Sequence, residues 1–403
     1  MLNMICEVCG NRHLATALSL GLHPLCDALQ PVSNAPFATD LYPINILFCD
    51  VCKTAHQQHQ VPKEILFPRS YHYRSNLTQD VISGTANLLS ETLGLLQIDA
   101  KNSSILDIGC NDGTLLDNAR VYFNHTYGIE PTDAALEAQA KSHTVIQDYF
   151  SPQTAHQFLT QYGHPDLITF TNVFAHIEDF DELVSSLQIL LSSGKAQYLV
   201  IENHYLGSIL SSNQFDTFYH EHPRTYSATS FMYVAKRLDM TLMNISFPSR
   251  YGGNIRVVMG KPGCSPIDPQ YLDTILTSEE LFGVKLLSLE NFLEAWRSNK
   301  SNELSRLVGR YGPLRAKAFP GRAAILLNIL KANCSTFSQV YEKPSSPKVG
   351  NFVPGTDIPI VSDETFDIQD QRPIVNLAWH IKSEIEAYMR DLGFHGQIVN
   401  ILD

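Results

Sequence analysis

Short apolar runs alternate with amphipathic stretches through the middle of the chain. The segment Val81 to Leu96 carries apolar side chains at helical spacing, which predicts a helix. Four apolar runs follow, and we expect each to form a buried β-strand with helices between them: Ser104 to Ile108, Thr126 to Ile129, Leu167 to Phe170, and Tyr198 to Ile201. This alternation predicts a parallel sheet whose two faces are covered by helices.

The pattern differs toward both ends of the chain. Residues 1 to about 70 are rich in turn-forming prolines and hold one short strand candidate, Ile44 to Phe48. Glu279 to Trp296 and Ser301 to Leu307 are predicted helices, and Ile381 to Leu392 is another. Four late apolar runs predict a second α/β unit: Ala323 to Leu330, Ile358 to Val361, Ile374 to Leu377, and Gln397 to Leu402.

Charge and composition exclude several classes of protein. The 403 residues are 44% hydrophobic and 17% charged, which is ordinary for a folded globular protein. Because 41 acidic residues outnumber 29 basic ones, the net charge is -12, and we expect no broad binding to nucleic acid or to anionic membranes. No apolar run reaches the ~20 residues of a membrane span, and the N-terminus lacks signal-peptide features, so we expect a cytoplasmic protein.

Two pairs of cysteines share the same close spacing. Cys6 and Cys9 form one C-x2-C pair, and Cys49 and Cys52 form another. Disulfides rarely persist in the cytosol, whereas two such pairs supply the four thiolates of a closed tetrahedral zinc site. We therefore predict a structural Zn2+ bound by these cysteines. Two alternatives stay open: the thiols are unrelated, or a nearby histidine replaces one ligand, namely His13, His23, His56 or His59.

A glycine-containing turn follows the first strand of the predicted sheet. Gly109 to Gly113 lies between that strand and a helix, at the edge where ligands of α/β proteins bind. Glu130 follows the next strand, where a carboxylate can accept hydrogen bonds from ribose hydroxyls. Asn111 replaces the second glycine of the dinucleotide fingerprint, so a nucleoside without phosphates fits better than a plain dinucleotide. With Asp148 downstream, the pattern resembles class I S-adenosylmethionine-dependent methyltransferases; a plain strand, turn and helix is the alternative.

Titratable side chains gather downstream of the same strands. Thr171 to Asp179 follows one predicted strand, and Glu202 to Tyr205 follows the next. The segment Tyr219 to His222 then places Tyr, His, Glu and His side by side, which is costly in a protein interior unless the groups are hydrogen-bonded. Such clusters are typical of general acid-base sites. A surface histidine cluster or an adventitious metal site is the alternative.

The order of motifs along the chain resembles one enzyme family. The motifs are the paired cysteines, Tyr71 to Ser75, Leu106 to Gly113, Asn172 to Asp179, Tyr219 to His222, Gly252 to Arg256, and Lys348 to Thr356. Over essentially the whole chain they are similar to the nucleotide-sugar C-methyltransferases, which act at C3 of 4-keto deoxysugars. This resemblance implies a zinc-binding module (1–70), a doubly wound class I methyltransferase domain that binds S-adenosylmethionine (71–245), and a C-terminal, Rossmann-like α/β domain that binds the nucleotide sugar (246–403).

The resemblance also implies roles for individual residues. His222 would be the base that takes the C3 proton to give an enolate, and Glu221 and Tyr219 would orient or stabilise the reacting groups. His176, with either Tyr71 or Tyr73, would line the sugar pocket, where these side chains could donate to the oxyanion. The implied cofactor-binding residues are Tyr71, Ser75, Asp107, Gly109, Asn111, Gly113, Leu115, Glu130, Pro131, Asp148 and Asn172. The implied substrate-binding residues are Asn203, His204, Asn254, Arg256 and Lys348. The family also implies a monomer.

The chain departs from the family pattern where the nucleotide sugar should be held. Family members typically carry a Gly-Ala-Pro-Ala-Lys-Gly-like turn, and this chain instead has Ala316 to Arg322. Tyr251 and Asn254 stand where His and Ser are common, and His380 stands where Asn is expected. Four basic residues either pair with a diphosphate or are simply solvated: Arg256, Lys317, Arg322 and Lys348. The alternatives are methyl transfer to oxygen or nitrogen of another small molecule, and a non-catalytic docking protein.

Overall fold

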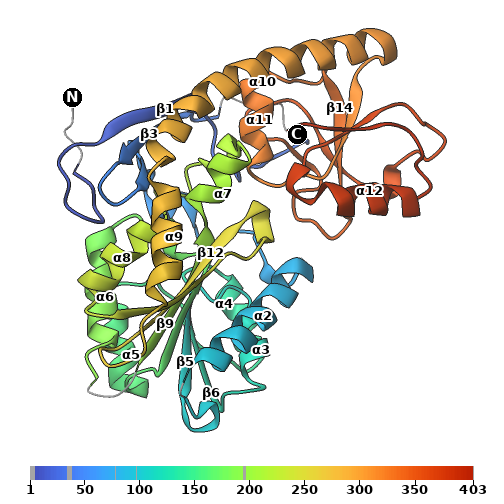
Figure 1. Cartoon of the computed structure of the whole chain (residues 1–403). Coiled ribbons are helices and arrows are strands. Elements are labelled where there is room, and N and C mark those ends of the chain that lie inside the picture. Colours follow the sequence, from blue (N-terminus) through green and yellow to red (C-terminus); the bar gives the residue numbers. More distant parts are fainter. Residues whose placement is uncertain (1–4, 34–38, 78, 97, 194–196, 403) are drawn as a thin grey trace.

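The computed structural model describes residues 5–33, 39–77, 79–96, 98–193 and 197–402. Figure 1 shows a lower lobe built around a large sheet, a C-terminal lobe beside its upper end, and a small N-terminal sheet between the start of α10 and the lower lobe. The first four residues, at which we expect no signal peptide, lie outside the described ranges. Within those ranges, none of the helices has the length and apolar character that crossing a bilayer requires.

The large sheet has seven strands in the order β11-β12-β9-β8-β5-β6-β7. Five strands are parallel, and β12 runs antiparallel to β9 and to β11. The bounds are β5 (Ser104–Ile108), β6 (His125–Ile129), β7 (Thr144–Ile146), β8 (Leu167–Thr171), β9 (Tyr198–His204), β11 (Thr241–Ser246) and β12 (Asn254–Gly260). All four strands predicted in this region are confirmed, and the doubly wound class I methyltransferase fold is confirmed with them.

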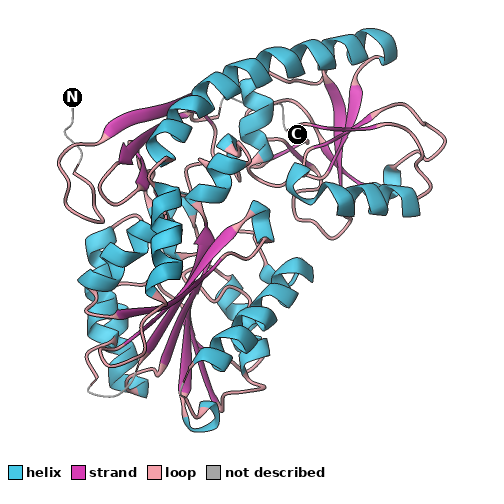
Figure 2. Cartoon of the chain, viewed as in Figure 1, coloured by secondary structure: helices cyan, strands magenta, loops and turns pink. Residues whose placement is uncertain are grey.

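Helices cover both faces of this sheet, as Figure 2 shows. One side carries α2 (Gln79–Leu95), α3 (Thr114–Ala119) and α4 (Ala134–Ala140). The other side carries α5 (Pro152–Tyr162), α6 (Phe180–Leu190) and α8 (Ala228–Arg237). The predicted helix from Val81 is confirmed as α2. Ser151 and Ser227 each begin their helix with a capping box, because the side chain accepts a hydrogen bond from a backbone N–H of the first turn.

The N-terminal sheet combines strands from two distant parts of the chain. Its order is β1 (Ala15–His23), β3 (Tyr42–Cys49), β4 (Thr54–Gln57) and β10 (Arg224–Thr225), and a short helix, α1 (Lys63–Leu66), follows β4. The predicted strand from Ile44 is confirmed as part of β3. The fully buried Arg224 bonds the Glu7 carboxylate beside the cysteine pairs and the carbonyls of Ile177 and Glu178. This side chain therefore ties the N-terminal module to the loop after β8.

The C-terminal lobe is a five-stranded, wholly parallel sheet in the order β16-β14-β13-β17-β18. Its elements are β13 (Leu314–Lys317), α11 (Ala323–Ile329), β14 (Phe337–Glu342), β16 (Ile360–Ser362), β17 (Ile374–Asn376), α12 (Lys382–Asp391) and β18 (Ile398–Asn400). The second α/β unit and its late helix are confirmed. The run Ala323 to Leu330 forms a helix, unlike the other three apolar runs, because a short, fully buried helix and a buried strand show the same continuous apolar pattern.

One long helix joins the two lobes. The two helices predicted between Glu279 and Leu307 are confirmed as helical and as a long connector, but the break between them is wrong, since α9 (Pro269–Glu279) is followed by one unbroken helix, α10 (Phe282–Tyr311). Figure 1 shows α10 crossing from the N-terminal sheet over α11 to the far end of the C-terminal lobe. Contacts of α10 with β1 and with α7 (Leu206–Ser211) anchor its first half. A two-strand pairing of β2 (Gln30–Pro31) with β15 (Asn351–Phe352) adds a second connection between the ends of the chain.

Candidate active site

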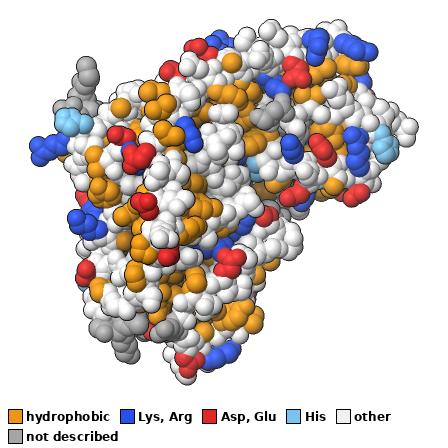
Figure 3. Space-filling view, viewed as in Figure 1, with side chains coloured by type: hydrophobic (Ala, Val, Ile, Leu, Met, Phe, Trp, Pro, Cys, Tyr) orange, Lys and Arg blue, Asp and Glu red, His pale blue; other side chains and the backbone are white. Residues whose placement is uncertain are grey.

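A cavity of about 690 Å3 lies where the sheet of the lower lobe, the segment after α1 and the C-terminal lobe meet. Its walls come from the carboxyl ends of β5, β6 and β8, from Phe67 to Ser75, from the 219–222 segment, and from the loops after β13 and β14. Figure 3 shows that the surface is hollowed between the C-terminal lobe and the lower lobe. The parallel strands of the large sheet thus end at one wall of the cavity, where α/β proteins bind ligands.

The glycine turn after β5 forms part of this wall of the cavity. Gly109 has a φ of +71°, and a Cβ at this position would lie 2.5 Å from a methyl group of Val173. Its backbone N–H donates to the Ile129 carbonyl at 2.7 Å, which fixes the turn against β6. The Ser75 N–H donates to Asn111 Oδ1 at 2.9 Å, so the 71–75 segment lies over the turn. The absence of a side chain at Gly109 keeps the turn compact beside the cavity.

Two carboxylates lie under this turn. Glu130, only 5% exposed, accepts hydrogen bonds from the Asn111 N–H at 3.0 Å and from the Thr132 N–H at 2.9 Å. Asp107 accepts one from the Thr169 hydroxyl at 2.7 Å. Burial, together with the charge of Glu130 and against the lowering effect of the Thr169 bond, raises the pKa of Asp107 to about 7. Both carboxyl groups line the cavity at the carboxyl ends of β5 and β6.

His222 lies at the centre of a cluster of aromatic rings in the cavity. Its Nδ1 is 3.0 Å from the Thr217 carbonyl, and because a carbonyl only accepts, Nδ1 carries the proton and Nε2 carries the lone pair. The rings of Tyr219, His176 and His204 lie 4.3, 5.1 and 5.1 Å from its ring. Burial, together with the charge of Arg322, lowers the pKa of His222 to about 4 although the Thr217 bond raises it. His222 is therefore a neutral imidazole with a free acceptor near neutral pH.

The other two histidines of the cluster are also held neutral. Burial first, and then the neighbouring His222, lower the pKa values of His176 and His204 well below their ordinary range. His176, at the end of η3 (Phe174–His176), stacks on Phe67 with ring centroids 5.3 Å apart and an angle of 10° between the rings. Phe67 lies just after α1, so the N-terminal module supports one wall of the cluster.

A carboxyl group and a phenol form a second pair in the cavity. The Tyr71 hydroxyl lies 3.2 Å from Glu221 Oε2, and both side chains line the cavity. Burial, and then the negative charge of Asp27, raise the pKa of Glu221 to about 8. Asp27 comes from the turn after β1, and its Oδ1 lies 3.4 Å from His72 Nε2. Neither Asp27 nor Phe67 is suggested by a local sequence signal, since both enter the cavity only through the packing of the N-terminal module.

The structure brings most of the predicted site residues together around this one cavity. The predicted residues that line it are Tyr71, Tyr73, Ser75, Asp107, Gly109, Asn111, Leu115, Glu130, Pro131, Asn172, His176, His204, Tyr219, Glu221, His222 and Lys348. Tyr73 is at its outer edge, with 40% of its surface exposed. Five other predicted residues lie outside the lining: Gly113, Asp148, Asn203, Asn254 and Arg256.

These five residues have other surroundings. Gly113 begins α3 at a φ of +81°, and Asp148 is exposed and bonds the N–H of Tyr149. Arg256 is buried in an ion-pair network, with Nε 2.7 Å from Glu202 Oε2 and Nη1 on Glu91. Asn254 donates to the same Glu202 at 3.1 Å. Asn203 is buried, and its amide has no hydrogen-bond partner among the described residues.

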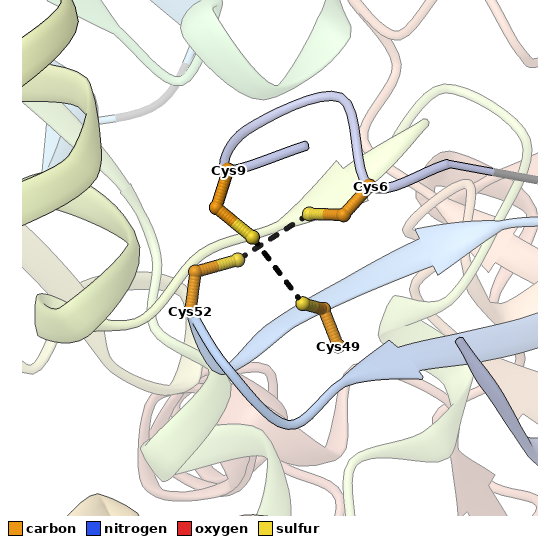
Figure 4. A group of neighbouring side chains, drawn as sticks. All are labelled: Cys6, Cys9, Cys49 and Cys52. Carbon is orange, nitrogen blue, oxygen red and sulfur yellow. Dashed lines mark hydrogen bonds between the residues drawn. The ribbon is translucent and has the colours of Figure 1, made fainter. Parts of the chain in front are cut away.

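The four predicted metal ligands converge at the other end of the N-terminal sheet, as Figure 4 shows. The Sγ atoms of Cys6, Cys9, Cys49 and Cys52 all lie within 4.8 Å of one another, with Cys6 and Cys52 3.4 Å apart. His56 Nε2 adjoins the cluster, 3.3 Å from Cys6 Sγ. Among the described residues no other group of His, Cys, Asp and Glu converges in this way, which opposes a metal site at the histidine cluster.

Both expected cofactors fit these sites. Four thiolates within bonding reach of one point, and no open position, are the donor set of structural Zn2+. The cavity wall of Gly109, Glu130 and Pro131 at the strand ends suits the nucleoside part of S-adenosylmethionine, because the turn carries no side chain and the carboxylate faces the cavity. The residues present therefore fit a structural zinc ion at the four cysteines and S-adenosylmethionine at the ends of the strands.

Comparison with known families divides almost the whole chain among three models. Residues 6–67 match a zinc binding domain, residues 73–243 match a methyltransferase domain, and residues 249–401 match a C-methyltransferase C-terminal domain. The chain is also 25% identical, over 393 residues, to the C-methyltransferase NovU of Streptomyces niveus, a match that covers 94% of this chain and 90% of that protein.

Solved structures with similarity to this chain include two methyltransferases. A S-adenosylmethionine-dependent methyltransferase from Clostridium acetobutylicum ATCC 824 is 13% identical, with 47% of this chain and 97% of that chain covered and a TM-score of 0.36. The N-methyltransferase NodS from Bradyrhizobium japonicum WM9, in complex with S-adenosyl-L-homocysteine, is 14% identical, with 46% and 89% covered and a TM-score of 0.34. Each of these matches spans less than half of this chain.

Proposed function

Because the chain belongs to the family of S-adenosylmethionine-dependent C-methyltransferases that carry an N-terminal zinc-binding domain, we propose that it methylates C3 of a nucleotide-linked 4-keto-6-deoxysugar. The substrate class comes from the motif resemblance, and the described cavity supports it. We further propose the division of labour expected from the sequence, with residues 1–70 as the zinc module, 71–245 as the cofactor domain and 246–403 as the nucleotide-sugar domain.

The state of His222 is the observation that supports this chemistry most. A hydrogen next to a ketone is acidified, but its removal still needs a positioned base. The Thr217 carbonyl holds the Nδ1 proton, and the lowered pKa keeps the ring neutral, so Nε2 carries the lone pair that would take the C3 proton. Methyl transfer to an oxygen or nitrogen would depend less on such a base, because these atoms already carry a lone pair and no C–H proton has to be removed.

The reaction then follows from the groups around His222. Nε2 takes the C3 proton, and the electrons of the C–H bond move into an enolate whose charge lies largely on the C4 oxygen. When bound, S-adenosylmethionine supplies an electrophilic methyl group, which forms the new bond to C3. Because its raised pKa keeps Glu221 protonated, the pair of Glu221 and Tyr71 would border the sugar without adding negative charge. An ionised carboxylate at this place would repel the enolate.

The C-terminal lobe would hold the nucleotide. Lys348 lines the cavity, and its Nζ donates to the Phe319 carbonyl at 3.1 Å, which leaves further N–H groups for a phosphate oxygen. Lys317 also lines the cavity, but its charge is already paired, since both oxygens of Asp363 lie within 2.8 Å of its Nζ. Holding the nucleotide in one lobe and the cofactor in the other would align C3 with the methyl group.

The proposal is tested by exchange at C3 without methyl transfer. The protein is incubated in deuterium oxide with S-adenosylhomocysteine and a panel of 4-keto nucleotide sugars, and the loss of the C3 proton signal is followed by NMR. We expect exchange with at least one sugar, and we expect its loss in His222→Ala. His220→Ala is the matched control, because His220 is equally buried but bonds the Tyr42 carbonyl outside the cavity lining.

Two outcomes would contradict the proposal. Exchange that survives in His222→Ala while methyl transfer is lost would remove His222 from the role of base. No exchange with any keto sugar, despite measurable binding of S-adenosylhomocysteine, would contradict the substrate class and favour methyl transfer to an oxygen or nitrogen.

A further inference from the structure

Arg322 is a buried cation in the same cavity. It lies just before α11 in the C-terminal lobe, is 8% exposed, and lines the cavity. Its Nε lies 3.2 Å from Asp216 Oδ2, and its guanidinium carbon lies 4.7 Å from the centre of the Trp379 ring. The Trp379 Nε1–H donates to the same Asp216 oxygen at 2.9 Å. The planar guanidinium is therefore held in one orientation by a carboxylate and by a ring face.

Thr217 connects this guanidinium to His222. Nη1 of Arg322 donates to the Thr217 hydroxyl oxygen at 3.1 Å, and the Thr217 carbonyl accepts the Nδ1 proton of His222 at 3.0 Å. One residue thus fixes both the proposed base and the cation. Both Nε and Nη2 are buried without a hydrogen-bond partner among the described residues, and of the two only Nε has a carboxylate at ion-pair distance, that of Asp216. An unpartnered N–H of a buried cation is costly, and a ligand oxygen would satisfy it.

Burial is the main cause of the lowered pKa of His222, and the charge of Arg322 adds to it, so protonation of His222 is unfavourable in the empty site. After burial and the charge of His222, the charge of Arg322 also lowers the pKa of His204. A second positive charge on His222 becomes favourable only when negative charge develops between the two cations. The C4 oxygen of an enolate is two bonds away from C3, where His222 would act. Its negative charge can therefore accept a hydrogen bond from Arg322 and also stabilise the protonated His222.

We infer that Arg322 binds the C4 oxygen of the substrate through Nη2 and stabilises the enolate that His222 generates. This inference rests on the proposed function, because it assigns a role in that reaction. When His222 Nε2 takes the C3 proton, the C–H electron pair becomes the C3–C4 double bond, and the carbonyl electron pair moves onto the oxygen at Nη2. Formation of the C3–methyl bond would use the pair of the C3–C4 double bond and return the oxygen pair to the carbonyl, while the sulfur–methyl bond breaks and its electron pair stays on sulfur in the departing S-adenosylhomocysteine. The C-terminal lobe would therefore contribute a catalytic residue as well as a binding surface.

The same exchange assay, run at saturating sugar, tests the inference. Removing one donor from a preorganised oxyanion site typically lowers the rate by about 100- to 1,000-fold, and we expect Arg322→Met to lower the C3 exchange rate on this scale with little change in KM. Arg322→Lys keeps the positive charge but loses the planar guanidinium with its paired N–H donors, and it should retain more activity than Arg322→Met. Arg310→Met removes an exposed arginine from α10, outside the cavity lining, and should exchange at the wild-type rate.

Two further measurements separate catalysis from folding. Arg322→Met leaves Asp216 buried without its cation, so the double variant Arg322→Met/Asp216→Asn removes both charges and should show the same rate loss with normal zinc content. Added guanidinium ion should partly restore exchange in Arg322→Ala, an effect that a purely structural role would not produce.

The outcomes distinguish the two proposals. A raised KM with an unchanged exchange rate in Arg322→Met would overturn the inference and place the guanidinium on the diphosphate, while the proposed function would stand. A wild-type exchange rate in the double variant would overturn it as well. If the unmodified protein exchanges none of the keto sugars, the proposed function fails, and the inference fails with it.

Discussion

Gly109→Ala offers a direct test of how the turn after β5 is built. Two separate costs follow from the structure. The φ of +71° places alanine in the left-handed region, at a cost of roughly 1–2 kcal/mol. The new Cβ would also lie 2.5 and 2.7 Å from the two methyl groups of Val173, far inside normal contact distance, and relief of such overpacking costs roughly 1–3 kcal/mol. Together they predict a loss of about 2–5 kcal/mol in the free energy of unfolding.

Two matched variants separate these costs. Gly350 has a φ of +86°, and nothing lies within 4 Å of the position of its Cβ, so Gly350→Ala should pay only the roughly 1–2 kcal/mol of conformational strain. Val173→Ala removes the two methyl groups that a Cβ on Gly109 would strike. The double variant Gly109→Ala/Val173→Ala should therefore be more stable than the sum of the two single losses predicts, by roughly 1–3 kcal/mol.

The assay has a structural and a functional part. Urea unfolding gives the free energies for the double-mutant cycle, and calorimetry gives the affinity for S-adenosylhomocysteine. Val173 lines the cavity, so its displacement in Gly109→Ala should weaken binding by about tenfold, or 1.4 kcal/mol, whereas Gly350→Ala should bind normally. Equal losses of stability in Gly109→Ala and Gly350→Ala, or additivity in the cycle, would refute the reasoning from the Val173 contact.

Three further predictions concern the two cofactor sites and the carboxyl pair. We expect activity to fall as pH rises through about 8, because Glu221 then loses its proton and repels the enolate. Asp27→Asn removes a neighbouring negative charge and lowers the pKa of Glu221, so the alkaline limb of the pH-rate profile should move to lower pH; an unmoved limb would contradict this. Cys49→Ser should release zinc, as measured by atomic absorption, and retention of stoichiometric metal would exclude the four-cysteine site. Glu130→Ala should weaken binding of S-adenosylhomocysteine by about 1–3 kcal/mol in calorimetry, and an unchanged affinity would remove Glu130 from the ribose site.

The sequence by itself determined the elements of the large sheet and the metal site. The mostly apolar run Ser104–Ile108, followed by a glycine turn, predicted a buried strand, and β5 has these bounds. The two C-x2-C pairs predicted a convergence that the structure contains, because each tight turn brings its own two thiols together. The glycine turn and Glu130 were placed correctly at one edge of the sheet, since the carboxyl ends of parallel strands lie side by side.

Only the tertiary structure decided which distant groups meet. Arg256 matched a family motif yet lies in a buried ion-pair network outside the cavity, because the alternation along β12 turns its side chain toward Glu202. Asp27 carries no local signal, and the sequence offered Arg322 only as a partner for a diphosphate. The N-terminal turn and the start of α11 bring both side chains into the cavity that residues 219, 221 and 222 also line. Periodicity along a chain fixes which face of an element is buried. It does not fix which other element covers that face, and this packing sets the charges and hydrogen bonds around His222.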